Sequence, residues 1–210
     1  MKIIAFCGLT QSGKDTAAEG LYELGYTKSS FAQKLKEVIA DVYQVPIEWM
    51  NDTILKNTPC KELWGKTPRD ILQPVATEGF REGGHPDTWV NYLHAKLAMQ
   101  EKYKNLESEF FLSITDIRFP NEARMLRDIG ASLVWIRNPH AIAGTHASES
   151  QVESVGKEFA DFTIDNDKTL LTIPELHATV QNIAAKVKSV DLTKYDPFKN
   201  ITARSIYDRE

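Results

Sequence analysis

The chain has 210 residues, which suits one domain with a substantial apolar core. Apolar residues make up 42% of it and charged residues 26%, the balance of an ordinary globular protein. The formal net charge of −4 argues against a general nucleic-acid coat, whose footprint would be a basic surface, while it leaves room for a local basic pocket that binds a small anion. The two cysteines form neither a disulfide framework nor a zinc cluster.

Signals for a membrane or for secretion are equally lacking in the sequence. No stretch approaches the roughly 18 consecutive apolar residues of a membrane-spanning helix. The first apolar run ends in glycines and a lysine, which does not predict a secretory signal. We therefore expect a protein of the cytoplasm, without a membrane or nucleic-acid partner.

In chain order, the predicted elements alternate between strand and helix. The apolar run KIIAFC (residues 2–7) is of the kind that forms a buried parallel strand. The pattern then predicts a helix over 14–24, an extended segment over 26–31, a helix over 32–43 and a mostly irregular stretch over 46–66. The next helix opens at Thr67 and Pro68, has a kink at Pro74 and ends at Gly83 and Gly84. A long helix over 87–104 completes the first half of the chain.

The second half begins with another core strand, FFLSITD (residues 110–116). After it the pattern predicts a helix over 121–129, a strand over 131–137, an irregular lid-like loop over 138–158, a strand over 161–167, a last helix from Pro174 to about Ser189 and an aperiodic tail over 191–210. Such an alternation predicts an α/β fold, in which a parallel β-sheet is flanked by helices on both faces.

The segment GLTQSGKDT follows the first strand and fits the phosphate-binding pattern G-x-x-x-x-G-K-[ST] through Lys14. A glycine-rich turn between a buried strand and a helix exposes a ring of backbone N–H groups that suits the β- and γ-phosphates of a nucleotide. Glycines permit close approach of the backbone, and the lysine adds a point charge. We therefore expect ATP to bind at Gly8, Gln11, Ser12, Gly13, Lys14, Asp15 and Thr16.

The segment departs from the pattern at the position after the lysine. A hydroxyl residue that ligates Mg²⁺ commonly stands there, but this chain has Asp15 at that position and its hydroxyl one residue later, at Thr16. Since Mg²⁺ keeps several of its waters, a carboxylate can hold it through one of them. Alternatively, Asp15 merely favours the positive end of a helix. Asp116 closes the strand over 110–116, as a Walker-B-type aspartate does, and could approach the metal or its waters. We expect Asp15, Thr16 and Asp116 to serve the Mg²⁺ site, through water.

Several arginines could contact a second substrate, the one that accepts the phosphoryl group. Arg118 comes directly after a core strand, at the sheet edge where ligands of open α/β folds collect. An alternative is that Asp116 caps the next helix and that Arg118 pairs with Glu122. Arg69 and Arg81, taken alone, are as readily explained as surface charge on a helix.

A set of motifs occurs here together and in order: GLTQSGKDT, then R-x-x-L-Q followed by T-E-x-x-R between Arg69 and Arg81, then TDIRFPNEA, then T-H-x-S-E from Thr145 to Glu149. This set resembles the phage-type deoxynucleoside monophosphate kinases, which are P-loop enzymes of the nucleoside monophosphate kinase fold. The likeness covers most of residues 1–190 and leaves 191–210 unexplained. It implies a single P-loop kinase domain with a helical acceptor-binding region at about 45–105 and a lid-like loop at 138–158.

The resemblance implies that ATP donates its γ-phosphoryl group, with Mg²⁺, to a deoxynucleoside 5′-monophosphate. Trp89 would stack on a base or simply pack in the core. Because residues 138–158 contain no arginine, clamping of the phosphates would fall to Arg137 and the core arginines. The implied catalytic residues are Lys14, Arg118 and Arg137. The implied contacts to the acceptor nucleotide are Arg69, Gln73, Arg81, Trp89, Asp116, Arg118 and Glu122. The resemblance also implies that the loop that closes over the phosphates has His146, Ser148 and Glu149 in or beside it, and that the donor adenine is bordered by Asn166 and Asp167.

The chemistry of a monophosphate acceptor suits this inventory. Its second pKa lies near ~6, so the attacking oxygen is largely ionised at neutral pH and no general base is needed. Two other interpretations stay open. A small-molecule P-loop kinase of the dephospho-coenzyme A kinase type attacks with a hydroxyl and would need Asp15 or Asp116 as base, whereas a nucleotide-binding regulatory protein would have no acceptor pocket. A homodimer is a further expectation.

Overall fold

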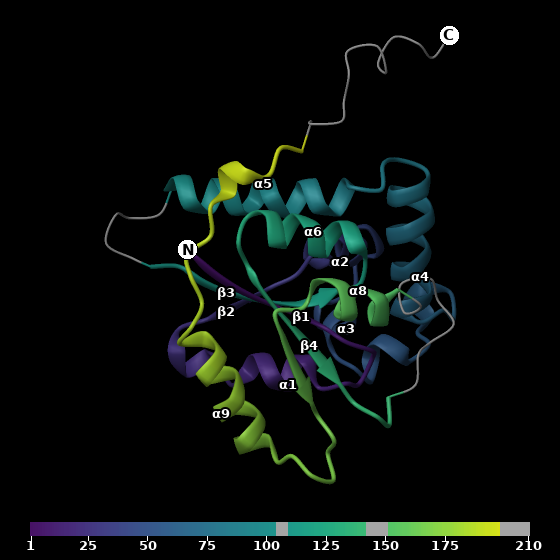
Figure 1. Cartoon of the computed structure of the whole chain (residues 1–210). Helices are drawn as coiled ribbons and strands as arrows, with labels where there is room; N and C mark the ends of the chain where they lie inside the picture. The colour runs from purple at the N-terminus through teal and green to yellow at the C-terminus, as the bar shows by residue number, and fades with distance from the viewer. Residues whose placement is uncertain (104–108, 142–150, 198–210) are drawn as a thin grey trace. The chain divides into compact units, whose positions relative to one another are not determined.

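The computed structural model describes residues 1–103, 109–141 and 151–197 (Figure 1). The chain divides into two compact units, one of residues 1–28 and 94–210 and the other of residues 29–93. No helix in the described ranges is both long and apolar enough to cross a membrane.

The first unit contains a five-stranded sheet in the order β2-β3-β1-β4-β5. β1 runs parallel to β3 and to β4, and β4 runs parallel to β5, as the alternation of elements predicts. Parallel strands bring their carboxyl ends to one edge, so the loops that follow β1, β3, β4 and β5 gather there. The strands are β1 (Lys2–Cys7), β2 (Thr27–Ser29), β3 (Phe111–Ile117), β4 (Ser132–Arg137) and β5 (Phe162–Asp165).

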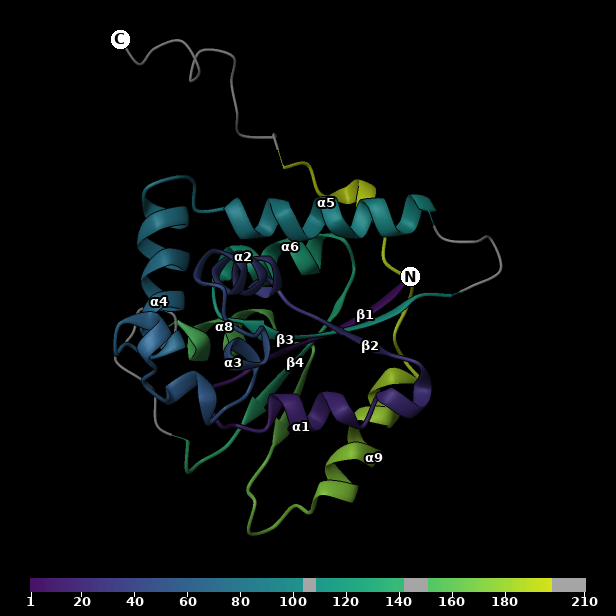
Figure 2. The same cartoon turned by 180° about the vertical axis from the view of Figure 1, so that it is seen from behind.

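Helices cover both faces of this sheet (Figure 1 and Figure 2). On one face, α1 (Lys14–Glu19) packs against α9 (Ile173–Ala184); on the other, α6 (Pro120–Asp128) packs against α8 (Val152–Phe159). The predicted fold class, a parallel sheet between helical layers in the manner of a P-loop kinase, is therefore confirmed.

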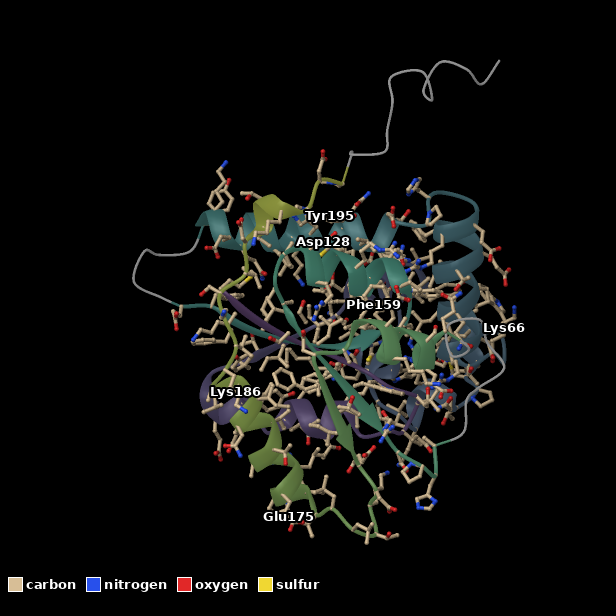
Figure 3. The ribbon with its side chains drawn as sticks, viewed as in Figure 1. Lys66, Asp128, Phe159, Glu175, Lys186 and Tyr195 are labelled. Atoms are coloured by element: carbon tan, nitrogen blue, oxygen red, sulfur yellow. The ribbon has the colours of Figure 1, made fainter. Side chains whose placement is uncertain are left out.

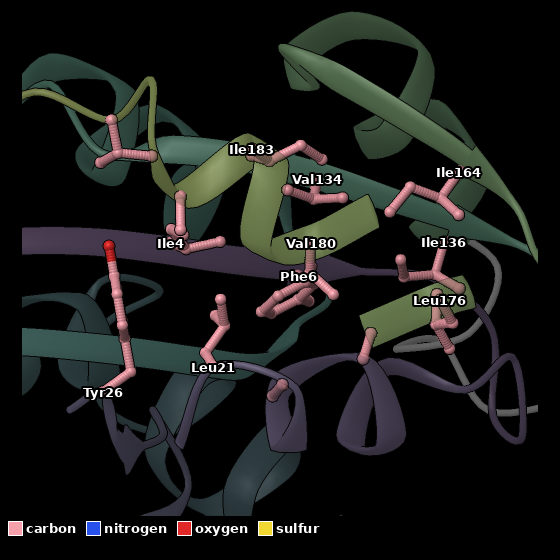
Figure 4. Packing of buried hydrophobic residues seen from close by; sticks show 14 residues of the cluster. Ile4, Phe6, Leu21, Tyr26, Val134, Ile136, Ile164, Leu176, Val180 and Ile183 are labelled. Carbon is pink, nitrogen blue, oxygen red and sulfur yellow. The ribbon is translucent and has the colours of Figure 1, made fainter. Parts of the chain in front are cut away.

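An apolar cluster fills the space between the sheet and the α1–α9 layer (Figure 4). Strands contribute alternate residues, such as Ile4 and Phe6, because successive side chains of a strand point to opposite faces. Phe6, Leu21 and Val180 are fully buried, and each such side chain stabilises the fold by about 1.5–3 kcal/mol. The labelled members are Ile4, Phe6, Leu21, Tyr26, Val134, Ile136, Ile164, Leu176, Val180 and Ile183.

The helix α8 corrects the expectation of an irregular loop over 138–158. Val152, Val155 and Gly156 form its buried side, at the spacing of three and four residues that an amphipathic helix requires. A Cβ on Gly156 would lie 2.4 Å from the indole of Trp135 in β4, so this helix packs directly on the sheet. A single short apolar stripe with a glycine inside it gave too weak a period to predict.

The second unit contains the helix that the sequence predicts after Thr67 and Pro68. This prediction is confirmed by α4, and at the expected kink, Pro74, the chain changes from an α-helix to a π-helix. The stretch 46–66 holds more order than expected. The elements outside the sheet unit's two layers are η1 (Tyr22–Leu24), α2 (Gln33–Tyr43), α3 (Glu48–Asn51), η2 (Leu55–Asn57), η3 (Lys61–Leu63), α4 (Pro68–Pro74), the π-helix η4 (Val75–Glu82), α5 (Thr88–Tyr103) and η5 (Leu192–Lys194).

The expected tail over 191–210 begins as folded chain. The N–H of Asp191 donates to the carbonyl oxygen of Ile129 at 2.7 Å, and the carbonyl of Leu192 lies 3.0 Å from Nε2 of His94 in α5. The ring of Tyr195, labelled in Figure 3, lies 4.9 Å from the ring of His94. Leu192 and Tyr195 therefore contact α5, Asp191 bonds the residue that follows α6, and 198–210 lie outside the described residues.

The contact between Gly156 and Trp135 predicts a stability effect. Gly156→Ala forces α8 away from β4 and lowers the free energy of unfolding by about 1–3 kcal/mol, as overpacking does. Gly79→Ala is the matched control, because a Cβ on Gly79 meets nothing within 4 Å; it changes stability by about 0.5 kcal/mol or less, or stabilises slightly. Urea denaturation of the two variants tests this, and equal midpoints would contradict the packing.

Candidate active site at the carboxyl edge of the sheet

The loop between β1 and α1 owes its shape to two glycines. Gly8 has a φ of 151° and Gly13 a φ of 100°, which side chains rarely adopt. A Cβ on Gly8 would lie 2.4 Å from the carbonyl oxygen of Ile136, the last residue but one of β4. The loop is therefore pressed against the neighbouring strand ends, and a glycine-rich turn of this kind can present backbone N–H groups to an anion.

Lys14 is the buried cation of this loop. Its ammonium Nζ donates to the carbonyl oxygens of Gly8 and Leu9, each at 2.7 Å, and these are its only partners among the described residues. Burial and, after it, the nearby charge of Arg118 lower the pKa of Lys14 to about 8, although Asp15 and other groups partly oppose them. Among the described residues the ammonium therefore meets carbonyl oxygens but no carboxylate within hydrogen-bond distance, and an anion such as phosphate would neutralise it.

Asp15 lies beside the end of β3. Its Oδ1 accepts a hydrogen bond from the hydroxyl of Thr115 at 2.9 Å and pairs with the ammonium of Lys28. Partial burial raises the pKa of Asp15, but the hydrogen bonds and charge of Lys28 and the hydrogen bond of Thr115 outweigh it, so the pKa lies below its usual value. Oδ2 has no hydrogen-bond partner among the described residues. Lys28 could not be predicted as a partner of Asp15, because a lysine on a short edge strand belongs to no motif.

The residues predicted for Mg²⁺ fit a site in which the substrate phosphates supply part of the coordination better than a site made of protein ligands alone. Within the described residues no cluster of three or more His, Cys, Asp or Glu side chains could hold a metal on its own. Mg²⁺ in kinases is commonly held by one or two carboxylates, its waters and the substrate phosphates. Asp15 fits this donor set, since its carboxylate is 63% exposed, and Asp116 adjoins Thr115, which bonds Asp15.

Arg118 follows β3 in a turn that Glu122 fixes. The buried carboxylate of Glu122 accepts the backbone N–H of Arg118 at 2.8 Å and that of Phe119 at 3.1 Å, which caps α6. Asp116 and Arg118 lie close enough to Lys14 for their charges to act on its pKa. The structure therefore brings together Lys14, Asp15, Asp116 and Arg118, while it gives Glu122 a supporting place under the turn.

A cleft of about 570 Å³ opens beside the loop. Leu9, Trp135, Pro139 and Leu170 contribute to its walls, with Arg137 and Asp167 among the charged residues. The guanidinium of Arg137 lies 5.4 Å from the Trp135 ring and pairs with both oxygens of Asp165, at 2.5 and 2.7 Å. Arg137 thus lies at the cleft, as its prediction as a phosphate clamp requires, but its charge is already paired.

Asn166 is buried behind the loop and does not line that cleft. Its side-chain amide Nδ2 donates to the carbonyl oxygen of Ser12 at 2.8 Å. Asp167, the next residue, does line the cleft, and the Thr169 hydroxyl and N–H that donate to its carboxylate lower its pKa. Of the two residues expected to border an adenine, Asp167 lines this cleft and Asn166 does not.

The predicted acceptor contacts of the second unit have local partners. Nε of Arg69 donates to Oδ1 of Asn57 at 2.7 Å, and Nη1 of the buried Arg81 donates to the carbonyl oxygen of Pro86 at 2.9 Å. Gln73 is half-buried on α4.

Trp89 packs in the core of the second unit, as the second of its two interpretations expects. Only 7% of it is exposed, its indole N–H donates to the carbonyl oxygen of Ala76 at 3.2 Å, and its ring lies 4.8 Å from that of Phe80. His146, Ser148 and Glu149, predicted in the closing loop, lie outside the described residues.

Comparison with known proteins finds one clear relative. No protein-family model matches the chain. It is 32% identical over 179 residues to a protein of Acanthamoeba polyphaga mimivirus named as an inferred deoxynucleotide monophosphate kinase, and the match covers 81% of this chain and 91% of that protein.

Likeness to solved structures is weaker. Shikimate kinase from Acinetobacter baumannii in complex with shikimate matches with a TM-score of 0.46 and 13% identity, over 89% of this chain and 94% of that one. Dephospho-CoA kinase from Campylobacter jejuni matches with a TM-score of 0.42 and 16% identity, over 88% and 96%. At these scores neither likeness bears on the reaction.

The lowered pKa of Lys14 predicts how nucleotide binding depends on pH. Below pH 8 the free protein carries the ammonium, so ATP binds without proton uptake; above it, binding must take up a proton, and affinity falls by up to about tenfold per pH unit. Lys14→Met binds ATP weakly and loses this dependence. Calorimetric titrations between pH 6.5 and 9.5 measure it, and a wild-type affinity that stays level across pH 8 would contradict the assignment.

Proposed function

The chain belongs to the deoxynucleotide monophosphate kinase family, and we propose that it transfers the γ-phosphoryl group of ATP to the phosphate of a deoxynucleoside 5′-monophosphate. It is a kinase, and the observation that carries the finer proposal is the meeting of Lys14, Asp15, Asp116 and Arg118 at the carboxyl edge of the sheet. Cations and carboxylates together at such an edge suit a reaction between two phosphates and a metal ion.

On the donor side, the Gly8–Lys14 loop holds the β- and γ-phosphates. Lys14 exchanges its bonds to the Gly8 and Leu9 carbonyls for phosphate oxygens, which relieves the burial of an unneutralised charge. The cleft beside Leu9 takes the base, between the Trp135–Arg137 side and Leu170. An ordinary ligand pocket has ~300–1,000 Å³, so its size of about 570 Å³ suits a nucleotide base and sugar.

Mg²⁺ bound to the donor phosphates would neutralise the charge that develops on them during transfer. Asp15 and Asp116 would hold it through its waters, with the Thr16 hydroxyl beside them. For Asp15 this means leaving Lys28, a bond that is cheap to give up because exposed ion pairs contribute only about 0–1 kcal/mol.

On the acceptor side, Arg118 meets the monophosphate, held in place by the Glu122 cap on its backbone. Arg69, Gln73 and Arg81 of the second unit add further contacts, as the family resemblance implies. The attacking phosphate oxygen is already ionised near neutral pH, so the residues need only place the phosphates in line and balance their charge.

A hydroxyl acceptor suits the site less well. Such a reaction needs a general base, whose efficiency is best when its pKa lies near the working pH. The hydrogen bonds and charge around Asp15 hold its pKa below the usual value, which makes it a weak proton acceptor. An ionised monophosphate avoids this requirement.

The acceptor set is tested by a coupled ADP-release assay with Mg-ATP and each of the common deoxynucleoside monophosphates, alongside the matching ribonucleotides. Turnover with deoxynucleotides and little with ribonucleotides supports the proposal. Silence with every monophosphate, from folded protein that still binds ATP, would overturn it in favour of a hydroxyl acceptor or a regulatory role.

Arg118 should separate acceptor use from donor binding. We expect Arg118→Ala to raise the KM for the monophosphate by roughly 10- to 100-fold, the loss of a charge-assisted contact, and to change ATP affinity by less than about threefold. Arg124→Ala is the control, since Arg124 is exposed on α6 and lies over the ring of Phe159, labelled in Figure 3. Equal losses of both substrates in a folded Arg118→Ala protein would contradict the role.

The role of Asp15 should be visible in the Mg²⁺ concentration that the reaction requires. If it holds Mg²⁺, Asp15→Asn raises the Mg²⁺ concentration for half-maximal rate by about fivefold or more at saturating ATP, since an uncharged amide attracts the ion less. If it only favours the helix end, that concentration stays as in wild type and only stability falls, by about 0.3–1 kcal/mol. Rates across an Mg²⁺ series, with the melting temperature beside them, distinguish the two.

A further inference from the structure

Asn166 connects three segments that converge behind the phosphate loop. It follows β5 and is 4% exposed. Its backbone N–H donates to the carbonyl oxygen of Arg137 at the end of β4, at 2.7 Å. Its side-chain amide crosses to the loop and donates to the carbonyl oxygen of Ser12 at 2.8 Å. One residue therefore ties the ends of β4 and β5 to the loop after β1.

The loop is shaped around this amide. A Cβ on Gly13 would lie 2.2 Å from Nδ2 of Asn166, well inside any contact distance. Because Nδ2 is committed to Ser12, it could not move aside without breaking that bond. The hydroxyl of the fully buried Ser12 has no partner among the described residues, so the side-chain anchor of this part of the loop comes from Asn166.

We propose that Asn166 is a positioning residue for phosphoryl transfer: by holding the Ser12 carbonyl it fixes the peptide between Ser12 and Gly13, and with it the direction of the N–H groups that receive the donor phosphates. A peptide is planar, so fixing its carbonyl oxygen fixes its N–H, which points the opposite way. The N–H of Gly13 is thereby turned away from Asn166, to the ligand side of the loop. The inference rests on the proposed use of this loop for ATP.

The neighbours of Asn166 extend its role to the donor cleft. Asp165 on one side pairs with Arg137, and Asp167 on the other lines the cleft. The strand end that contacts the base of ATP is thus the one that holds the loop for its phosphates. A merely space-filling amide would leave ATP affinity unchanged when it is replaced in a protein that still folds.

The test measures binding of the non-hydrolysable ATP analogue AMP-PNP with Mg²⁺, in the full chain and without an acceptor. Asn166→Ala should weaken binding by about tenfold, the equivalent of one buried hydrogen bond, while the KM for the monophosphate changes by less than about twofold. Asn182→Ala, the same change at an exposed position on α9, is the matched control and should bind the analogue as wild type does. Thermal melts confirm that each variant is folded.

Asn166→Asp adds a readout that depends on the hydrogen bond itself. At pH 8 the ionised carboxylate faces the Ser12 carbonyl without a donor, so binding falls by more than tenfold. A buried carboxyl group is protonated more readily than an exposed one, and its O–H can then donate as the amide does. Relative to wild type at the same pH, affinity should recover at least severalfold at pH 5.5.

Folded Asn166→Ala that binds the analogue as wild type does, or an Asn166→Asp loss that is the same at pH 8 and pH 5.5, would overturn the inference. Both results leave the proposed function standing. Conversely, wild-type protein that binds the analogue but phosphorylates no monophosphate contradicts the proposed acceptor and leaves the positioning role of Asn166 intact.

Discussion

The burial of an ammonium group that has no carboxylate partner in the described part of the chain is the constraint around which the first unit is organised. Lys14 donates to two loop carbonyls and to nothing else among the described residues, and burial holds its pKa near 8. Such a charge is costly to keep unless a ligand completes its neutralisation. The backbone angles of Gly8 and Gly13 shape the loop whose carbonyls reach this cation, and Asp15, next to Lys14 in sequence, pairs with Lys28.

Parallel pairing of the strands explains why Asp116, Arg118 and Arg137 lie at the same edge of the sheet as Lys14. β3 and β4 flank β1 in the same direction, so the residues after β3 and β4 appear at the edge where the phosphate loop begins. Asp116 and Arg118 reach Lys14 from one side of β1, and Arg137 with Asp165 borders the cleft on the other. The proposed donor would then lie on one side of Lys14 and the proposed acceptor on the other, which is the arrangement that in-line transfer needs.

Much of this edge could be predicted from the sequence, because its residues are attached to strong local signals. The loop follows a buried strand, and Asp116 and Arg118 end another, so strand prediction alone places them together. The family resemblance drawn from the motifs is supported by the mimivirus relative. Lys28, Thr115 and the Ser12 bond of Asn166 could not be predicted, since they depend on pairings between segments up to 154 residues apart. The helix α8 was missed because its stripe is short and interrupted by Gly156.

The central claim is that a phosphoryl group passes from ATP to a monophosphate at the edge that carries Lys14. Phosphorus NMR of a mixture of Mg-ATP, one deoxynucleoside monophosphate and the protein measures this directly, because every phosphorus species is seen at once. The account predicts that deoxynucleoside diphosphate and ADP appear in equal amounts and that Lys14→Ala yields neither. Inorganic phosphate in place of the deoxynucleoside diphosphate, or undiminished transfer by Lys14→Ala, would contradict it.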